Sequence, residues 1–269
     1  MNAELEIYMS AKSEIYAKSA AFDLFGQLER LENDLSMFID GSSVSIINSL
    51  KPGETAVVME PTIEALAAAM YASNISKGAI DVCMGDFFLN AKNKAKLENP
   101  SKAKLEIDPE NFMVRKLAPG RIDFGAIGKG FALELLAQKL VEVWGIDVAR
   151  FSFGGSSHLA LNAPEESDSW EITFAGQKAD WLKFKNCAIA SSGTAIQGMH
   201  ILDCRSGKVP EKSPLRTWAI CDSAMLADAM STAFMILSRE EISEICKSQN
   251  VIAGIQESEG AEIEWIGRE

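Results

Sequence analysis

Apolar residues recur at every third or fourth position along the first long segment of the chain, from about residue 12 to residue 38. This spacing predicts an amphipathic helix with one face toward the core. The short run before it, residues 4–9, has the pattern of a strand. The residues predicted to face the core from the helix are Ala21, Leu24, Leu28, Leu31, Leu35 and Phe38.

The next part of the chain alternates between predicted elements and polar connections. A second helix is predicted over residues 61–77, and residues 89–109, rich in Lys and Asn, are typical of a loop or insertion. A pair of strands is predicted within residues 111–124, around a Pro-Gly turn, followed by a helix from about 127 to 144 that Gly145 ends. The apolar positions of the second helix are Ile63, Leu66, Ala67, Met70 and Tyr71.

From residue 149 to residue 220 the pattern changes to short strands separated by turns. Ser238 and Glu241 have the spacing of a capping box at the start of a last helix. Two strands are predicted after that helix. Because helices are mixed with clustered strands rather than alternating with them, the chain is predicted to be α+β, with residues 1–269 forming a single domain. The strand runs are 150–153, 170–174, 187–190, 217–220, 250–256 and 262–266.

The segment 222–237 is almost wholly apolar but carries an acid, Asp228, and a hydroxyl, Thr232, four residues apart. On a helix these two side chains share one face, and a helix apolar on most sides is usually buried. Two oxygen ligands one turn apart suit a hard cation such as Mg²⁺. The alternative is structural: Asp228 caps or pairs with a neighbouring backbone, and Thr232 donates to the carbonyl four residues before it.

Composition narrows the class of protein. Of the 269 residues, 47% are hydrophobic, and the formal net charge of −12 argues against nucleic-acid binding as the main function. The five cysteines are scattered, without the spacing of a zinc site or a disulfide framework. No run approaches the roughly 18 apolar residues of a transmembrane segment, and no signal peptide is visible. These features favour the cytoplasm, and a periplasmic or membrane-anchored location stays open if a further segment precedes the sequence.

Residues 122–130, Ile-Asp-Phe-Gly-Ala-Ile-Gly-Lys-Gly, form a glycine loop between a predicted strand and a predicted helix. The glycines allow a ligand to approach the backbone, and the free N–H groups of the following helix suit a phosphate. Lys129 adds a positive charge. The order of the glycines is neither the dinucleotide fingerprint nor a Walker A loop. The alternative is a tight turn without a ligand.

His200 and Asp203 lie three residues apart in a segment that resembles a turn or extended chain. Side chains alternate along extended backbone, so the two do not form a catalytic pair by themselves. A lone histidine is more often structural than catalytic, and both roles stay open at this point.

Taken together, these segments resemble the ApbE family, the FAD:protein FMN transferases. The glycine loop and its helix resemble the family's D-L-G-G-I-A-K-G-Y-A, and residues 200–210, HILDCRSGKVP, resemble H-I-I-D-P-R-T-G-x-P. Residues 223–237 resemble A-x-x-A-D-A-L-S-T-A-L-F-V-L, residues 78–85 resemble G-A-F-D-x-T-V-G, and residues 153–155 resemble L-G-G. Met1 and the strand after it are similar to the family's start. The segments follow the family order over essentially the whole chain.

The resemblance implies an α+β fold with a central β-rich core flanked by helices and two intertwined subdomains. It implies Mg²⁺-dependent cleavage of the FAD pyrophosphate, with FMN passed to a threonine hydroxyl of a target protein and AMP released. Asp228, Thr232 and the carbonyl of Ala126 would be the metal ligands. His200 and Asp203 would lie near the reacting phosphate. The implied FAD-binding residues are Met1, Ala79, Ile80, Asp81, Gly125, Gly128, Lys129 and Gly130.

Several positions depart from the family pattern. Cys83 stands where the family usually has Thr, Cys204 replaces a Pro, Ser156 follows the glycine pair where an acid is common, and residues 192–194 lack an Asp often found there. These departures keep open a non-catalytic FAD-binding protein. An FAD pyrophosphatase that gives FMN and AMP also stays open, because it would use the same site and differ only in the nucleophile.

Overall fold

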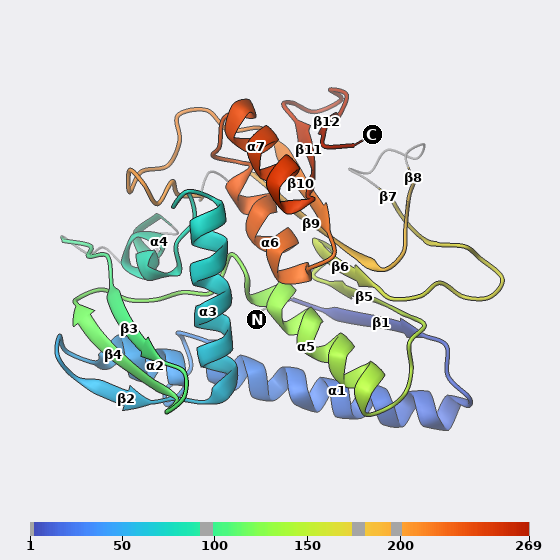
Figure 1. Ribbon diagram of the computed structural model, residues 1–269, viewed down its shortest axis with the longest axis horizontal. Helices are drawn as coiled ribbons and strands as arrows, with labels where there is room; N and C mark the ends of the chain where they lie inside the picture. The colour runs from blue at the N-terminus through green and yellow to red at the C-terminus, as the bar shows by residue number, and fades with distance from the viewer. Residues whose placement is uncertain (1–2, 92–98, 174–180, 195–200, 269) are drawn as a thin grey trace.

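A computed structural model describes residues 3–91, 99–173, 181–194 and 201–268 (Figure 1). The helices within them are α1 (Glu14–Leu35), α2 (Ser43–Ser49), α3 (Glu60–Ile75), the 3₁₀ helix η1 (Val82–Met84), α4 (Gly85–Ala91), α5 (Gly128–Glu142), α6 (Ala224–Ala233) and α7 (Arg239–Gln249). None of the described helices has the length and apolar character needed to cross a membrane.

The described strands form three antiparallel sheets. The seven-stranded sheet has the order β1-β5-β6-β9-β10-β11-β12, a small sheet has the order β2-β4-β3, and β7 and β8 form a hairpin. The strands of the large sheet are β1 (Leu5–Met9), β5 (Ala149–Phe153), β6 (Ser157–Ala160), β9 (Cys187–Gly193), β10 (Arg216–Cys221), β11 (Ile252–Gln256) and β12 (Glu264–Ile266). The others are β2 (Thr55–Val57), β3 (Lys104–Asp108), β4 (Met113–Ala118), β7 (Trp170–Thr173) and β8 (Trp181–Phe184).

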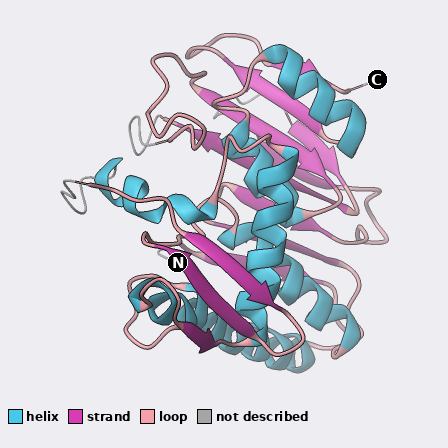
Figure 2. Cartoon of the chain, turned by 60° about the vertical axis from the view of Figure 1, so that its left-hand side comes forward, coloured by secondary structure: helices cyan, strands magenta, loops and turns pink. Residues whose placement is uncertain are grey.

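Helices cover one face of the large sheet. Helices α5 and α6 contact β6, α6 also contacts β9 and β10, and α7 contacts β11 and β12. Figure 1 shows this layer, and Figure 2 shows the small sheet at the other end of the molecule, with helices between the two sheets. The opposite face of the large sheet is covered in part by the β7–β8 hairpin, since Phe184 packs with Ala160 and Ile189. The predicted α+β class is confirmed.

Strand alternation explains which residues reach the helices. Leu5 pairs with Phe153, and Ile7 pairs with Phe151, so these four side chains point to the same face and enter the main core. Ser157 pairs with Phe153 and therefore points to this face as well. A polar side chain is thus directed into the layer between the sheet and the helices.

Most of the predicted elements are present, with bounds that differ by a few residues: the helices are shorter than predicted, whereas β5, β9 and β10 are longer. The strand at residues 4–9 is β1, the first helix is α1, the helix ended by Gly145 is α5, and the later strand runs correspond to β5, β7, β9, β10, β11 and β12. The capping box is present with both hydrogen bonds, from Ser238 and Glu241, at the start of α7.

Several positions predicted to face the core are exposed in the structure. Phe38 is 62% exposed because α1 ends at Leu35, three residues earlier, and the helical period stops there. On α3, Met70 and Tyr71 are exposed, whereas small residues such as Ala65, Ala69 and Ala72 are buried. Small residues let a helix approach its neighbours closely, so these alanines form the packed face of α3 together with Ile63 and Leu66.

The prediction for residues 89–124 was also wrong in part. Helix α4 extends to Ala91 and β3 occupies Lys104–Asp108, so this region is not a loop throughout, and residues 92–98 lie outside the described residues. Strand β4 pairs with β2 and β3 rather than with the residues after Gly120. Those later residues contact η1 and α4 instead, through the hydrogen bond from the Gly85 N–H to the Arg121 carbonyl, 2.9 Å. Helix α2 was not predicted.

Lys116, on β4, is 3% exposed, and its ammonium donates to the carbonyls of Ile47 (3.3 Å) and Asn48 (3.0 Å) in the last turn of α2. Burial lowers the pKa of Lys116 below its ordinary value of 10.5. The unfolded chain therefore keeps this proton at pH values where the folded chain has lost it. In the window between the lowered pKa and 10.5, this group makes the free energy of unfolding rise with pH.

We expect Lys116→Met to lose this contribution. The difference in unfolding free energy between wild type and variant should move in favour of the wild type as the pH rises through that window. Urea denaturation of both proteins at a series of alkaline pH values measures the difference. Parallel pH profiles for the two proteins would contradict the assignment.

Candidate active site

The carboxylate of Asp228, on α6, is buried and fully engaged. Its Oδ1 accepts hydrogen bonds from the Lys129 ammonium (3.1 Å) and the Ser157 hydroxyl (3.0 Å), and its Oδ2 accepts from the Gly130 N–H (3.0 Å). The residue is 3% exposed. A carboxylate removed from water in this way is tolerated only when it is paired and hydrogen-bonded. The cation and the N–H come from α5, and the hydroxyl comes from β6.

Helices α5 and α6 cap each other. The residue before α5 provides no side-chain cap, and Asp228 of α6 instead accepts from the N–H of Gly130 in the first turn of α5. In return, Glu134 of α5 accepts from the Ser223 hydroxyl (2.6 Å) and the Met225 N–H (3.1 Å) at the start of α6. Both carboxylates lie at the positive end of the partner helix, where free N–H groups stabilise them.

Gly130 is where the two helices come closest. A Cβ atom at this position would lie 2.1 Å from the carbonyl oxygen of Ala224 and 2.7 Å from the Cα of Met225, both backbone atoms of α6. No side chain fits there without moving a helix. The glycine predicted to contact FAD therefore has a second reason to be a glycine, which is the α5–α6 crossing.

Hydroxyl groups line the sheet beneath α6. The Ser192 hydroxyl is 3.0 Å from the hydroxyls of both Ser231 and Thr232, and Thr217 donates to the Ser231 carbonyl at 2.5 Å. Ser192 and Thr217 are cross-strand partners, so they point to the same face of the sheet. Thr232 also lies 3.4 Å from the Asp228 carbonyl, which is the contact expected from the structural alternative.

A small hollow lies between α3, η1, α4 and the glycine loop. It is lined by Ala69, Ile80, Asp81, Val82, Phe88, Asp123, Ala126 and Ile127. The Asp123 N–H donates to the Val82 carbonyl at 2.9 Å and holds the glycine loop against η1. The structure thus brings Ile80, Asp81 and Ala126, far apart in the sequence, around one hollow.

Asp81 has a cation of its own. Its Oδ2 pairs with the Lys102 ammonium at 2.7 Å, and its Oδ1 accepts from the Cys83 N–H at 2.9 Å. The hydrogen bond to Asp81 raises the pKa of Lys102. Burial raises the pKa of the Cys83 and Cys204 thiols to about 12, with the Asp81 charge adding to the effect. Both thiols are therefore protonated at neutral pH and are poor nucleophiles.

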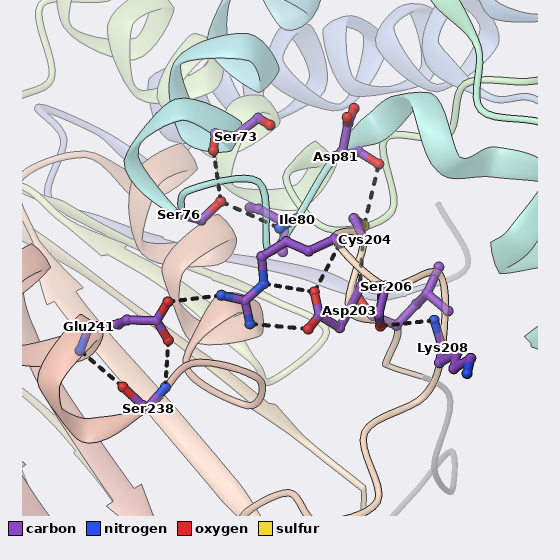
Figure 3. Close-up of polar contacts among 12 residues, drawn as sticks. Ser73, Ser76, Ile80, Asp81, Asp203, Cys204, Ser206, Lys208, Ser238 and Glu241 are labelled. Carbon is purple, nitrogen blue, oxygen red and sulfur yellow. Dashed lines mark hydrogen bonds and ion pairs between the residues drawn. The ribbon is translucent and has the colours of Figure 1, made fainter.

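Asp203 organises the loop that follows the predicted catalytic histidine (Figure 3). Both of its carboxylate oxygens accept from the Arg205 guanidinium, at 3.0 and 3.1 Å, and Arg205 also donates to Glu241 of α7 at 2.8 Å. The Cys204 N–H donates to the Ala79 carbonyl at 3.0 Å. These contacts join the loop both to α7 and to the segment that carries the predicted FAD-binding residues 79–81.

The described residues account for the predicted site in part. Met1 and His200 lie outside them. Ala3 and Lys129 both lie near Gly154, because a Cβ there would lie 3.0 Å from the Cβ of Ala3 and 4.0 Å from the Cδ of Lys129. Gly128 opens α5 and Gly125 donates its N–H to Asp123 at 3.2 Å. The site roles assigned from the resemblance stay predictions.

The oxygen donors near Asp228 suit Mg²⁺ in their chemistry. Asp228 supplies a carboxylate, and Thr232, one turn later, supplies a hydroxyl. Because the Gly130 N–H donates to Asp228, the carbonyl four residues before it, that of Ala126, lies outside the α5 hydrogen-bond ladder. No group of three or more His, Cys, Asp or Glu side chains among the described residues could hold a metal. A magnesium ion here would also need water and phosphate ligands, as Mg²⁺ commonly does.

Four further residues of the site were not predicted: Ser157, Ser192, Glu134 and Lys102. Ser157 and Ser192 lie on β6 and β9 but outside the predicted strand runs, so the sequence pattern did not mark them, whereas Glu134 is a single acid in an apolar stretch of α5. Glu134 is the same kind of signal that identified Asp228. Lys102 lies in the polar region predicted to be a loop, where nothing in the sequence distinguishes it.

We expect Gly130→Ala to destabilise the protein by about 1–3 kcal/mol, the usual cost of overpacking, because its methyl group would overlap the backbone of α6. Gly128→Ala is the matched control. Its Cβ would lie 3.8 Å from the Phe124 Cβ, an ordinary contact, and Ala favours a helix over Gly. Chemical denaturation compares the two variants, and equal unfolding free energies would contradict the crossing as described.

Comparisons with known proteins agree with this architecture. A search of curated proteins finds no match. Among solved structures, the chain is similar to the flavin transferase ApbE from Vibrio cholerae (19% identity, TM-score 0.83, 98% of this chain and 93% of that chain) and to the apo form of the Pseudomonas stutzeri flavinyl transferase ApbE (20%, 0.81, 98% and 95%). The ApbE protein from Thermotoga maritima is also similar (22%, 0.82, 98% and 94%). The sequence model of the ApbE family matches residues 1–255, and the chain belongs to this family.

Proposed function

We propose that this protein transfers FMN from FAD to a threonine hydroxyl of a target protein, with Mg²⁺, and releases AMP. The observation that carries the proposal is the buried Asp228 carboxylate, held against Lys129 and the N-terminus of α5 beside the glycine loop, in a chain of the ApbE family. Structural relatives named flavin transferases support the same reaction class.

The proposed roles follow from charge. Asp228, Thr232 and the Ala126 carbonyl would hold Mg²⁺, which when bound would neutralise charge on the phosphate oxygens. Lys129 and the N–H groups at the start of α5 would bind the pyrophosphate, because a helix N-terminus and a cation both favour an anion. Residues 79–81 and the hollow beside them would hold another part of FAD.

In the transfer step, the acceptor oxygen forms a bond to the phosphorus of FMN while the bond from that phosphorus to the bridging oxygen breaks. The hydroxyl proton passes to a base, for which we propose His200, and AMP leaves. Asp203 is bound by Arg205 through both carboxylate oxygens. We assign Asp203 the role of holding the loop next to His200.

Incubation with FAD and Mg²⁺, with and without a threonine-bearing acceptor protein, tests the proposal. Transfer is expected to give AMP together with covalently bound flavin on the acceptor. AMP and free FMN in equal amounts, with no labelled acceptor, would instead identify an FAD pyrophosphatase. FAD binding without AMP release would identify a non-catalytic binding protein.

We expect Asp228→Asn to lower Mg²⁺-dependent AMP release by at least about 100-fold, the scale typical of removing one charge-stabilising group from an active site. Asparagine keeps the size of the side chain and an acceptor for Gly130, but not the charge. Asp23→Asn is the matched control, since Asp23 pairs with Lys139 (2.7 Å) on the far part of α5 and should leave turnover unchanged. Wild-type turnover in the Asp228 variant would remove it from the metal site.

We expect His200→Ala to lower turnover by about 10²–10⁴-fold with little change in FAD affinity, as for a lost general base. A role in orienting FAD would instead raise the dissociation constant while turnover at saturation holds. A structural role would lower the melting temperature without either kinetic effect. Steady-state kinetics, calorimetry and thermal unfolding on one preparation separate the three.

A further inference from the structure

Lys129 and Asp228 are unequal partners in their ion pair. The Asp228 side chain is 4% exposed and is held by two further donors, Gly130 and Ser157, whereas the Lys129 side chain is 25% exposed. The lysine stem passes Gly154, since its Cδ lies 4.0 Å from the position that a Cβ on Gly154 would take. The carboxylate is fixed, and the ammonium is the member of the pair that can reach solvent.

The charges around Asp228 are already balanced by the protein. The Lys129 ammonium, 3.1 Å from Oδ1, cancels the formal charge of the carboxylate. The N-terminus of α5 adds a partial positive charge of roughly half a unit. A magnesium ion that entered alone would leave this buried site with a net charge above roughly +2, which is costly in a medium of low dielectric constant.

A pyrophosphate changes this balance, because its negative charges attract both cations at once. We propose that Lys129 is the resident counter-cation of Asp228 and makes Mg²⁺ binding depend on a pyrophosphate. With a pyrophosphate bound, the Lys129 ammonium would pair with the phosphate oxygens and Asp228 would be free to hold Mg²⁺. The inference rests on the proposed function for the identity of both ligands. By thermodynamic linkage, Mg²⁺ and the pyrophosphate then strengthen each other's binding equally.

Calorimetric titrations of the protein test the inference without measuring activity. MgCl₂ is titrated into the protein alone and into the protein with ADP, which carries a pyrophosphate but no flavin. The variants are Lys129→Met, Lys129→Arg, which keeps the charge, and Lys139→Met. Lys139 is the matched control because it lies on the same helix and pairs with an aspartate, Asp23, on α1. Mg²⁺ also binds ADP in free solution, and the heat of that reaction is the same for every variant, so it cancels when the variants are compared.

For Lys129→Met we expect Mg²⁺ alone to bind at least about tenfold more tightly than to the wild type, the low end of what one neighbouring charge does to an ionic equilibrium. ADP without metal should bind more weakly, and the coupling between Mg²⁺ and ADP should shrink. Lys129→Arg and Lys139→Met should match the wild type. A folded Lys129→Met with wild-type affinity for Mg²⁺ alone would overturn the inference. Lys129→Gln, also neutral, replaces it if thermal unfolding shows that the Met variant does not fold.

Wild-type AMP release from FAD is measured in parallel and separates this inference from the proposed function. If the wild type releases AMP with Mg²⁺ but Lys129→Met gains no affinity for Mg²⁺, the inference fails and the proposed function stands. If the wild type does not cleave FAD but the variant gains affinity, the inference stands alone. If no protein binds Mg²⁺ with or without ADP, both fail.

Discussion

The crossing of α5 and α6 at Gly130 is the constraint on which the rest of the site depends. The backbone of α6 lies where the side chain of residue 130 would be, so the first turn of α5 faces the first two turns of α6 directly. At that distance a carboxylate on each helix reaches the free N–H groups of the other, Asp228 in one direction and Glu134 in the other. One interaction therefore sets the helix angle, satisfies two helix ends and buries an acid.

The sheet beneath α6 has residue types that suit a buried acid. The face of the sheet toward α6 carries small residues, among them Ala190 and Ala219, with hydroxyls at the positions next to the polar side of the helix. Small side chains let α6 approach the strands, and the hydroxyls of Ser157, Ser192 and Thr217 form hydrogen bonds with polar groups of α6. The polar groups around Asp228 therefore lie in the core, in the layer between the large sheet and the helices.

The sequence predicts local features of the fold better than the choice of partners. Strand β1, helix α5 and the capping box of α7 depend on nearest neighbours, and each was predicted from its own segment. Two of the failures concern long-range choices. Whether β4 pairs with the residues after Gly120 or with β2 and β3 is decided by contacts across the chain, and the exposed face of α3 is decided by what packs against its alanines.

The same division applies to the site. Asp228 is visible in the sequence because a charge in an apolar helix needs a partner, and Lys129 is visible in the glycine loop, but nothing in either segment says that they meet. Their meeting requires Gly130 to admit α6 and Ser157 to face inward from β6, a strand that the sequence pattern does not predict. The pair is held by three elements separated by up to 99 positions in sequence. The residue types of one segment are enough to suggest which ligands it could bind. The balance of charge between Asp228, Lys129 and the N-terminus of α5, which decides how a cation and an anion bind, exists only after α5 and α6 cross.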